Sequence, residues 1–204
     1  MGVNLAVFAS HGGSGLQAII DACECGKLDA RVALVISNNS GSRALQRAKN
    51  HGIPAIHFSS AVIKEPHLLD AAVLSALLEH KIDIIFLAGY LKKLGRDVLK
   101  TFENRVYNIH PSLLPKYGGK GMFGINVHAA VIAAGEKETG ITIHKVNDEY
   151  DKGAIIAQRK VPVLDGDTPE ILAARVLQQE HVFIVEVLKE IIAAKLSWIA
   201  MPSN

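Results

Sequence analysis

The feature that most constrains this fold is a repeated alternation of short apolar runs with amphipathic segments. The stretches that separate the apolar runs have the 3.6-residue periodicity of helices. Continuous apolar strands linked by helical crossovers are typical of an α/β protein with a doubly wound, mostly parallel sheet and a Rossmann-like N-terminal half. The predicted strands are residues 3–9, 31–37, 54–58, 83–87 and 106–110, and the predicted helices are residues 16–25, 43–50, 66–81 and a segment ending near Phe102.

The pattern changes in the second half of the chain. A helix is predicted over residues 127–134, and residues 139–146 then alternate as a strand. A short acidic turn joins that strand to a second one at residues 154–161, which favours an antiparallel pair. Residues 169–194 form one long amphipathic helix or two abutting helices. We therefore expect a single domain over residues 1–204, with halves of about 1–100 and 101–204.

Composition narrows the class of protein. The net charge is +2 and 49% of the residues are hydrophobic, which fits a compact enzyme and gives no sign of the dense basic stripe of nucleic-acid binders. The first residues lack a basic segment before their apolar run, so we expect neither a signal peptide nor a membrane span there. Cys23 and Cys25 lie on one predicted helix and point in different directions, so we expect reduced thiols. A cytoplasmic protein without nucleic-acid or membrane partners is predicted, as a monomer or a homodimer.

A glycine-rich loop, Ser10 to Gly15, follows the first predicted strand and leads into a helix. This arrangement directs backbone N–H groups and the positive end of a helix toward an anion such as phosphate. Loops of this kind also occur without ligands, and the spacing is not the G-x-G-x-x-G of dinucleotide sites.

Asn108 and His110 form the most informative pair. Pro111 ends their strand, and residues two apart on a strand face the same side, so both side chains lie at its carboxyl edge. An amide donor and a protonated imidazole together can stabilise an oxygen that gains negative charge when a carbonyl is attacked. The alternative is an Asn that caps a turn beside a surface histidine.

Asp151 lies in the acidic turn and can accept a proton from an attacking amine. Its charge is also expected to raise the pKa of His110 and keep that histidine protonated. The alternative is a turn residue that precedes Gly153.

Two further features stay open at this point. Residues 118–124 are too rich in glycine for regular structure and form either a lid over a site or a slack surface connection. His110, His128 and His144 could together bind zinc, but they lie on different elements without metal-ligand spacing, and no metal site is predicted. His144 is predicted to be a hydrogen-bond partner of the site or a core histidine.

Asn108-Ile109-His110-Pro111-Ser112-Leu113-Leu114-Pro115-Lys116-Tyr117 resembles the signature of the folate-dependent formyltransferases. The resemblance extends over the whole chain, to Gln178-Gln179-Glu180-His181. It implies the formyltransferase fold, with a phosphate-binding N-terminal half and a folate-binding, catalytic C-terminal half. It also implies direct transfer of a formyl group from 10-formyltetrahydrofolate to the amine of 5-phosphoribosylglycinamide, a step of de novo purine (IMP) biosynthesis, without a metal.

The resemblance also implies roles for particular residues. Asn108 and His110 would flank the formyl group, with His110 as proton donor, and Asp151 would promote proton transfer. The folate would be bound by Leu91, Lys92, Lys93, Leu94, Asn108, Asn147, Asp148, Glu149, Tyr150 and Asp151. The phosphoribosyl substrate would be bound by Gly13, Ser14, Gly15, Leu16, Gln17 and Lys64, with Glu180 at its ribose hydroxyls.

The chain departs from the common pattern of this family at several positions. His11 and Gly15 alter the glycine loop, where His11 adds a donor and Gly15 removes the amide of an Asn. Lys64 stands where an Arg is frequent and offers a point charge without a bidentate fork. Leu91 and Lys92 replace Met and Arg, and the loop after Tyr117 is longer. These changes concern affinity and individual contacts.

Other members of the family remain as alternatives. A tRNA formyltransferase is expected to need a further basic domain, and a formyltetrahydrofolate deformylase a preceding regulatory domain, so the length of this chain favours neither. A sugar-nucleotide formyltransferase is opposed by the phosphate loop together with Glu180. A non-catalytic folate binder would be expected to lack Asn108, His110 or Asp151, and all three are present.

Overall fold

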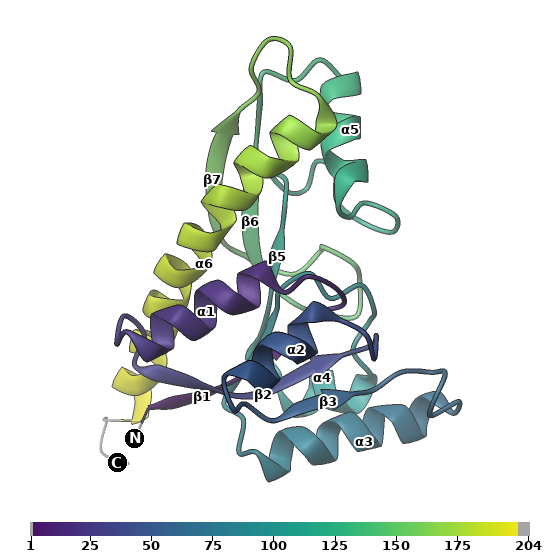
Figure 1. Cartoon of the computed structure of the whole chain (residues 1–204), viewed down its shortest axis with the longest axis vertical. Coiled ribbons are helices and arrows are strands. Elements are labelled where there is room, and N and C mark those ends of the chain that lie inside the picture. The colour runs from purple at the N-terminus through teal and green to yellow at the C-terminus, as the bar shows by residue number, and fades with distance from the viewer. Residues whose placement is uncertain (1, 200–204) are drawn as a thin grey trace.

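A computed structural model describes residues 2–199, with side chains through residue 196. One seven-stranded sheet runs through this part of the chain in the order β3-β2-β1-β4-β5-β6-β7 (Figure 1). The first five strands in sequence are parallel, and β6 and β7 are antiparallel to their neighbours. The predicted doubly wound α/β fold with an antiparallel pair is therefore confirmed. The strands are β1 (Val3–Phe8), β2 (Ala30–Ser37), β3 (Ala55–His57), β4 (Ile84–Leu87), β5 (Val106–His110), β6 (Glu138–Lys145) and β7 (Ile155–Pro162).

Helices cover both faces of the sheet because the central strands are apolar on both sides. In β1, Leu5 and Val7 belong to one buried cluster, and Ala6 and Phe8 to the other. Each fully buried aliphatic or aromatic side chain contributes roughly 1.5–3 kcal/mol. The first cluster packs on α1, α2, α5 and α6, and the second on α3 and α4. The helices are α1 (Ser14–Glu24), α2 (Arg43–Asn50), α3 (Pro66–Glu79), α4 (Arg96–Thr101), α5 (Ile125–Ala133) and α6 (Pro169–Ile199).

The long C-terminal helix is one continuous element, α6, rather than two abutting ones. It runs along the molecule from the lobe of β6, β7 and α5 to the lobe of β1 to β4, and it packs on α1 (Figure 1). Leu172, Val176, Leu188 and Ile192 repeat at helical spacing and are at most 2% exposed. Through these buried side chains, α6 packs on both lobes of the molecule.

The strand order reverses between β1 and β4. Both strands leave the sheet at the same edge, and their outgoing loops diverge to opposite sides, as at the ligand-binding crevice of other doubly wound sheets. The carboxyl ends of β1, β4 and β5 meet there, and the predicted site residues 13–17, 91–94, Asn108 and His110 lie at these ends or shortly after them.

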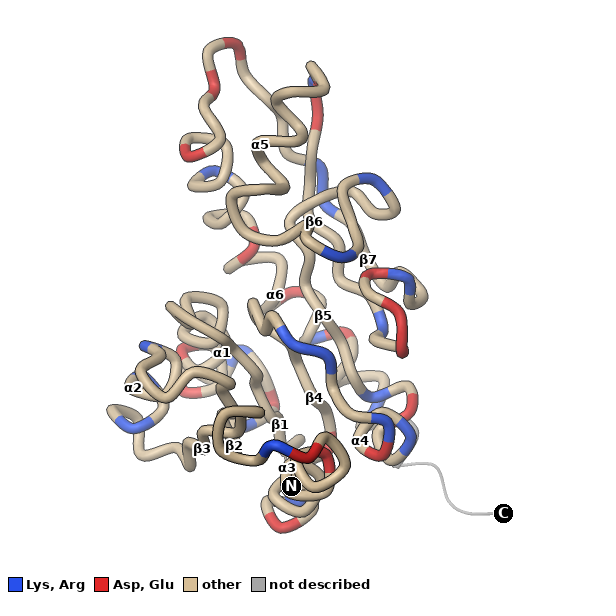
Figure 2. Tube along the Cα trace, turned by 90° about the vertical axis from the view of Figure 1, so that its right-hand side faces the viewer, with Lys and Arg blue, Asp and Glu red and all other residues tan. Residues whose placement is uncertain are grey.

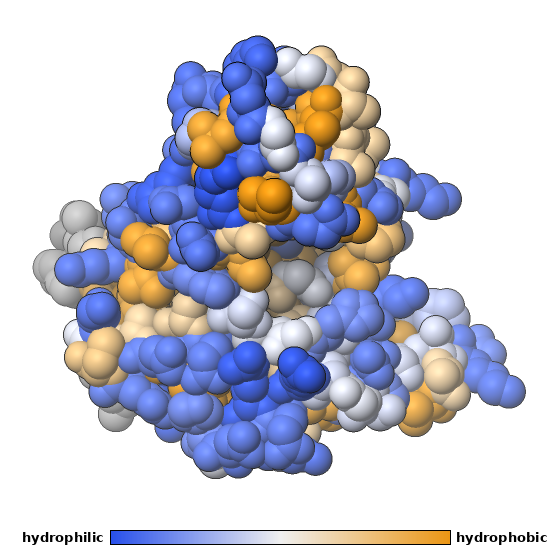
Figure 3. All heavy atoms as spheres, turned by 45° about the horizontal axis from the view of Figure 1, so that its top comes forward, coloured by the Kyte–Doolittle hydropathy of each residue, from blue (hydrophilic) through white to orange (hydrophobic). Residues whose placement is uncertain are grey.

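Charge and hydropathy vary over the surface. Basic and acidic positions are interspersed along both lobes (Figure 2). Hydrophobic residues are visible in the waist between the two lobes, whereas hydrophilic residues cover much of the rest of this face (Figure 3). Over residues 2–199, no helix combines the length and the apolar character that crossing a membrane requires.

Candidate active site

The waist contains a cavity of about 1290 Å³. A pocket for one drug-sized ligand has roughly 300–1,000 Å³, so this cavity has room for two substrates. Its lining includes all of the predicted folate-binding residues, from both 91–94 and 147–151, together with Asn108, His110, Gly15 and Glu180. Residues distant in the sequence are thus brought together at the predicted edge of the sheet.

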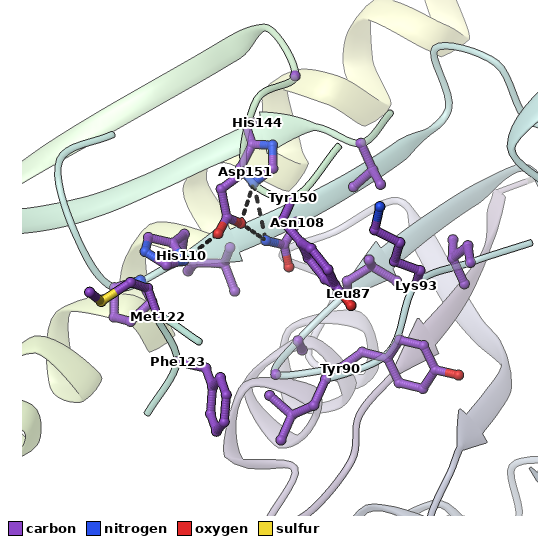
Figure 4. A pocket seen from close by; sticks show the side chains of 18 of the residues that line it. Leu87, Tyr90, Lys93, Asn108, His110, Met122, Phe123, His144, Tyr150 and Asp151 are labelled. Atoms are coloured by element: carbon purple, nitrogen blue, oxygen red, sulfur yellow. Dashed lines mark hydrogen bonds and ion pairs between the residues drawn. The ribbon is translucent and has the colours of Figure 1, made fainter. Parts of the chain in front are cut away.

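Asn108, His110, His144 and Asp151 form a connected polar cluster on one side of the cavity (Figure 4). Asn108 and His110 point to the same face of β5, as the strand alternation predicted. β6 pairs with β5 so that His144 lies opposite Asn108. Asp151, from the turn after β6, lies 3.5 Å from His110 Nδ1 through Oδ2 and 3.5 Å from His144 Nε2 through Oδ1.

The backbone of the acidic turn explains how Asp151 reaches this cluster. Asp151 has a φ of 57°, which turns the chain sharply. A Cβ atom at position 153 would lie 1.7 Å from the carbonyl oxygen of Lys145, so only glycine allows the return into β7. The N–H of Gly119 donates to Asp151 Oδ2 at 2.8 Å. Asp151 is therefore more than a turn residue, since its carboxylate is bound inside the cavity.

Burial and hydrogen bonds set the charge of Asp151. Burial raises the pKa of the carboxyl, but the electrostatic interactions with His144 and His110 and the hydrogen bond from the Gly119 N–H outweigh burial and hold the pKa below its usual value. Asp151 is thus an anion at neutral pH.

The prediction that Asp151 keeps His110 protonated is wrong for this structure. Burial, the largest effect, lowers the pKa of His110, and His144 lowers it further. The charge of Asp151 and the hydrogen bond to Tyr117 raise the pKa but do not compensate, because His110 is only 4% exposed. The sequence showed the carboxylate but not the desolvation of the imidazole.

Hydrogen bonds determine which atoms of Asn108, His110 and His144 face the cavity. His110 Nε2 donates to the carbonyl of Tyr117 at 2.7 Å, so Nδ1 carries the lone pair. His144 Nδ1 donates to the carbonyl of Lys145, and its Nε2 accepts from Asn108 Nδ2 at 3.1 Å. The Asn108 amide nitrogen thus faces His144 and Asp151, and its oxygen points away from them (Figure 4). His144 has the predicted role of a hydrogen-bond partner.

The segments predicted to bind folate form another part of the cavity wall. Lys93 Nζ donates to the carbonyl of Asp148 at 2.6 Å and lies 4.8 Å from the centre of the Tyr150 ring. Ser10 Oγ accepts from the N–H of Leu91 at 2.8 Å, which fixes the start of this segment. Leu87, Tyr90, Met122 and Phe123 also line the cavity and were not predicted as site residues. For Tyr90, the sequence offered one sign of a role in the site, which is its position directly after a predicted strand.

The glycine-rich loop 118–124 forms part of the cavity wall. Gly119 binds Asp151, and Met122 and Phe123 project from this loop (Figure 4). The loop is therefore not a slack surface connection. Whether it closes as a lid stays a prediction.

The predicted phosphate-binding residues lie in different environments. Gly13 precedes α1 with a φ of 66°, and a Cβ there would lie 2.9 Å from Ala44. The first hydrogen bond of α1 runs from Gln17 N to Gly13 O. The backbone N–H groups of Ser14, Gly15 and Leu16 therefore have no partner within the helix and face outward at its N-terminal end.

Other side chains of this group do not reach the cavity. Leu16 is part of the core, and Gln17 contacts Asp21, Arg47 and His51. Lys64 lies in the loop before α3, outside the residues that line the cavity. His11 lines a separate cavity of about 340 Å³ with Arg43 and Ser42.

Glu180 projects from α6 into the large cavity. Burial raises the pKa of its carboxyl to about 7. His128, from α5, lines the same cavity, and its Nδ1 atom is buried without a hydrogen-bond partner. Among the side chains through residue 196, no group of three or more His, Cys, Asp or Glu is placed to bind a metal ion. Cys23 and Cys25 are free thiols.

Comparison with known proteins adds independent findings. Residues 3–188 match the model of the family described as "Formyl transferase". The chain is 44% identical to the chloroplastic phosphoribosylglycinamide formyltransferase of Vigna unguiculata over 95% of its own length and 62% of the relative. It is 40% identical to the phosphoribosylglycinamide formyltransferase of Haemophilus influenzae, covering 91% of this chain and 85% of the relative. The crystal structure of glycinamide ribonucleotide transformylase 1 from Geobacillus kaustophilus superposes with a TM-score of 0.88 at 38% identity, covering 94% of this chain and 100% of that one.

Proposed function

This chain belongs to the formyl transferase family, and from that premise we propose that it transfers the formyl group of 10-formyltetrahydrofolate to the amine of 5-phosphoribosylglycinamide. The observation that carries the proposal is the cluster of Asn108, His110 and Asp151 in a cavity large enough for both substrates. The products are N-formyl-phosphoribosylglycinamide and tetrahydrofolate. The reaction belongs to de novo purine biosynthesis.

Different parts of the cavity suit the two substrates. Apolar side chains of Leu87, Tyr90 and Phe123 offer surfaces for a flat heterocycle, and the segments 91–94 and 147–151 offer backbone polar groups around it. The N–H groups of Ser14 to Leu16 at the positive end of α1 suit a phosphate. Glu180 then accepts from ribose hydroxyls. The folate supplies an activated formyl group.

Asn108 and His110 act on the formyl oxygen. As the amine nitrogen forms a bond to the formyl carbon, this oxygen gains negative charge, which a donor within hydrogen-bond reach stabilises. His110 donates through Nδ1 when the ring is protonated there, because the hydrogen on Nε2 stays bound to the carbonyl of Tyr117. Asn108 donates after its amide turns from His144, or through the hydrogen directed at Asp151.

Asp151 accepts the proton that the attacking amine loses. Its low pKa keeps it an anion, so it holds the forming ammonium by charge and accepts its proton directly or through water. The proton then passes to the departing folate nitrogen as the bond from that nitrogen to the formyl carbon breaks. No covalent enzyme intermediate is needed.

The test is to follow the absorbance change on deformylation of 10-formylated folate, with and without 5-phosphoribosylglycinamide, for wild-type protein and His110→Ala. We expect turnover only with the amine, and its collapse in the variant. Equal deformylation without the amine would make water the acceptor and overturn the proposal in favour of a deformylase. Tight folate binding without transfer to any amine would indicate a binding protein.

A further inference from the structure

The carbonyl of Tyr117 determines which nitrogen of His110 reaches the reaction. It lies 2.7 Å from His110 Nε2, and a carbonyl can only accept, so Nε2 carries the hydrogen of the neutral ring. Nδ1 is then the free nitrogen, 3.5 Å from Asp151 Oδ2. If this carbonyl moved, the neutral imidazole could place its hydrogen on either nitrogen, and Nδ1 would no longer be kept free.

The backbone at Tyr117 needs support to hold its carbonyl there. Tyr117 has a φ of 55°, a left-handed conformation that costs an aromatic residue about 1–2 kcal/mol. Such a conformation persists where neighbouring contacts determine it. On the backbone side, Ser112 Oγ donates to the carbonyl of Lys116 at 2.6 Å.

The side chain of Tyr117 is held by Glu136. The Tyr117 hydroxyl donates to Glu136 Oε1 at 2.9 Å, and Lys116 Nζ donates to the same oxygen at 2.8 Å. Glu136 follows α5, and its side chain is 26% exposed. Neither Tyr117 nor Glu136 is among the residues that line the cavity.

We propose that Glu136 is a positioning residue for the reaction: by binding the Tyr117 hydroxyl, it keeps the Tyr117 carbonyl on His110 Nε2 and leaves Nδ1 to exchange the proton. This role rests on the proposed function for its effect on turnover. The tautomer of His110 is a property of the protein without substrates and can be measured separately.

The surroundings of His110 allow the effect of Glu136 to be isolated. The titratable groups that face His110 are Asp151 from the acidic turn, His144 from β6 and His128 from α5. A substitution of Glu136 leaves all three in place. Glu136→Gln removes the charge but keeps an oxygen that can accept from the Tyr117 hydroxyl, so it separates the hydrogen bond from the charge.

Four variants test the proposal: Glu136→Ala, Glu136→Gln, Tyr117→Phe and Lys116→Met. Tyr117→Phe removes only the hydroxyl and keeps the ring that packs on the core. Lys116→Met removes the other partner of the same carboxylate and is the matched control. The ring nitrogens of His110 are observed by ¹⁵N NMR of histidine-labelled protein, with the resonance assigned through His110→Asn, and kcat is measured against pH.

We expect the wild type, Glu136→Gln and Lys116→Met to keep the hydrogen of neutral His110 on Nε2. In Glu136→Ala and Tyr117→Phe we expect mixed tautomers and a kcat lower by about fivefold to tenfold, since small misplacements of a reacting group are costly. The pH midpoint of kcat that reflects His110 should move down, because the bond to Tyr117 raises the pKa of His110.

The proposal is overturned if Glu136→Ala and Tyr117→Phe, with wild-type melting temperatures, both retain the Nε2–H tautomer. If one variant does not fold, the other decides. A wild-type protein that formylates no amine would refute the proposed function, while the NMR comparison would still decide the positioning role.

Discussion

Lys93 and Asp148 join two segments of the cavity wall that come from different strands: the Lys93 ammonium donates to the Asp148 carbonyl at 2.6 Å. The same ammonium lies 4.8 Å from the centre of the Tyr150 ring. One side chain after β4 thereby anchors the turn after β6 that carries Asp151. This contact is a long-range consequence of the sheet order, in which β5 alone separates β4 from β6.

Removing this anchor should weaken folate binding. We expect Lys93→Met to raise KM for the formylated folate by about twofold to fivefold, because an exposed cation–π contact contributes about 0.5–1 kcal/mol. Tyr150→Phe keeps the ring and should behave like the wild type, whereas Tyr150→Ala should resemble Lys93→Met. Steady-state kinetics of the double variant Lys93→Met/Tyr150→Ala complete a double-mutant cycle. If the effects of the two substitutions on KM were fully additive, Lys93 and Tyr150 would not be coupled.

Removing the charge of Asp151 should affect the chemical step. Asp151→Asn keeps the shape and loses the proton acceptor, so we expect kcat to fall by about 10²-fold to 10⁴-fold with little change in melting temperature. Asp165→Asn, at an exposed carboxylate that does not line the cavity, is the control. A kcat within twofold of the wild type for Asp151→Asn in single-turnover measurements would exclude this role.

Glu180 should make stability depend on pH. Burial raises the pKa of its carboxyl in the folded protein to about 7, above the ordinary value of 4.5. Between pH 4.5 and 7 the folded state therefore binds more protons than the unfolded state, and this residue makes the protein less stable as pH rises. We expect Glu180→Gln to raise the melting temperature more at pH 8 than at pH 5. An equal shift at both pH values would show that Glu180 has an ordinary pKa.

Asp70 should stabilise the start of α4. Its buried carboxylate, on α3, accepts from the N–H of Asp97 at 2.7 Å and from the N–H of Val98 at 3.4 Å. Asp70→Ala leaves these donors without a partner and should lower the free energy of unfolding by about 1–3 kcal/mol in urea titrations. Asp97→Ala keeps the backbone donor and should cost less than about 1 kcal/mol. Equal losses for the two variants would argue against the cap.

The sequence by itself determined the alternation of strands and helices, because the apolar periods of 2 and 3.6 residues are local and survive in any environment. It also determined that Asn108 and His110 share one face of β5, since that follows from the strand period and from Pro111. The signature around these residues indicated the family, and with it two segments, predicted to bind folate, that line one cavity.

Only the tertiary structure decided the state of those residues. The pKa of His110 depends on how much water its ring loses, and the tautomer depends on the carbonyl of Tyr117. The position of Lys64 outside the cavity lining and the long-range contacts of Glu136 and Lys93 depend on how distant segments pack. Desolvation and electrostatic interaction are sums over spatial neighbours, and a linear sequence states which residues exist but not which of them become neighbours.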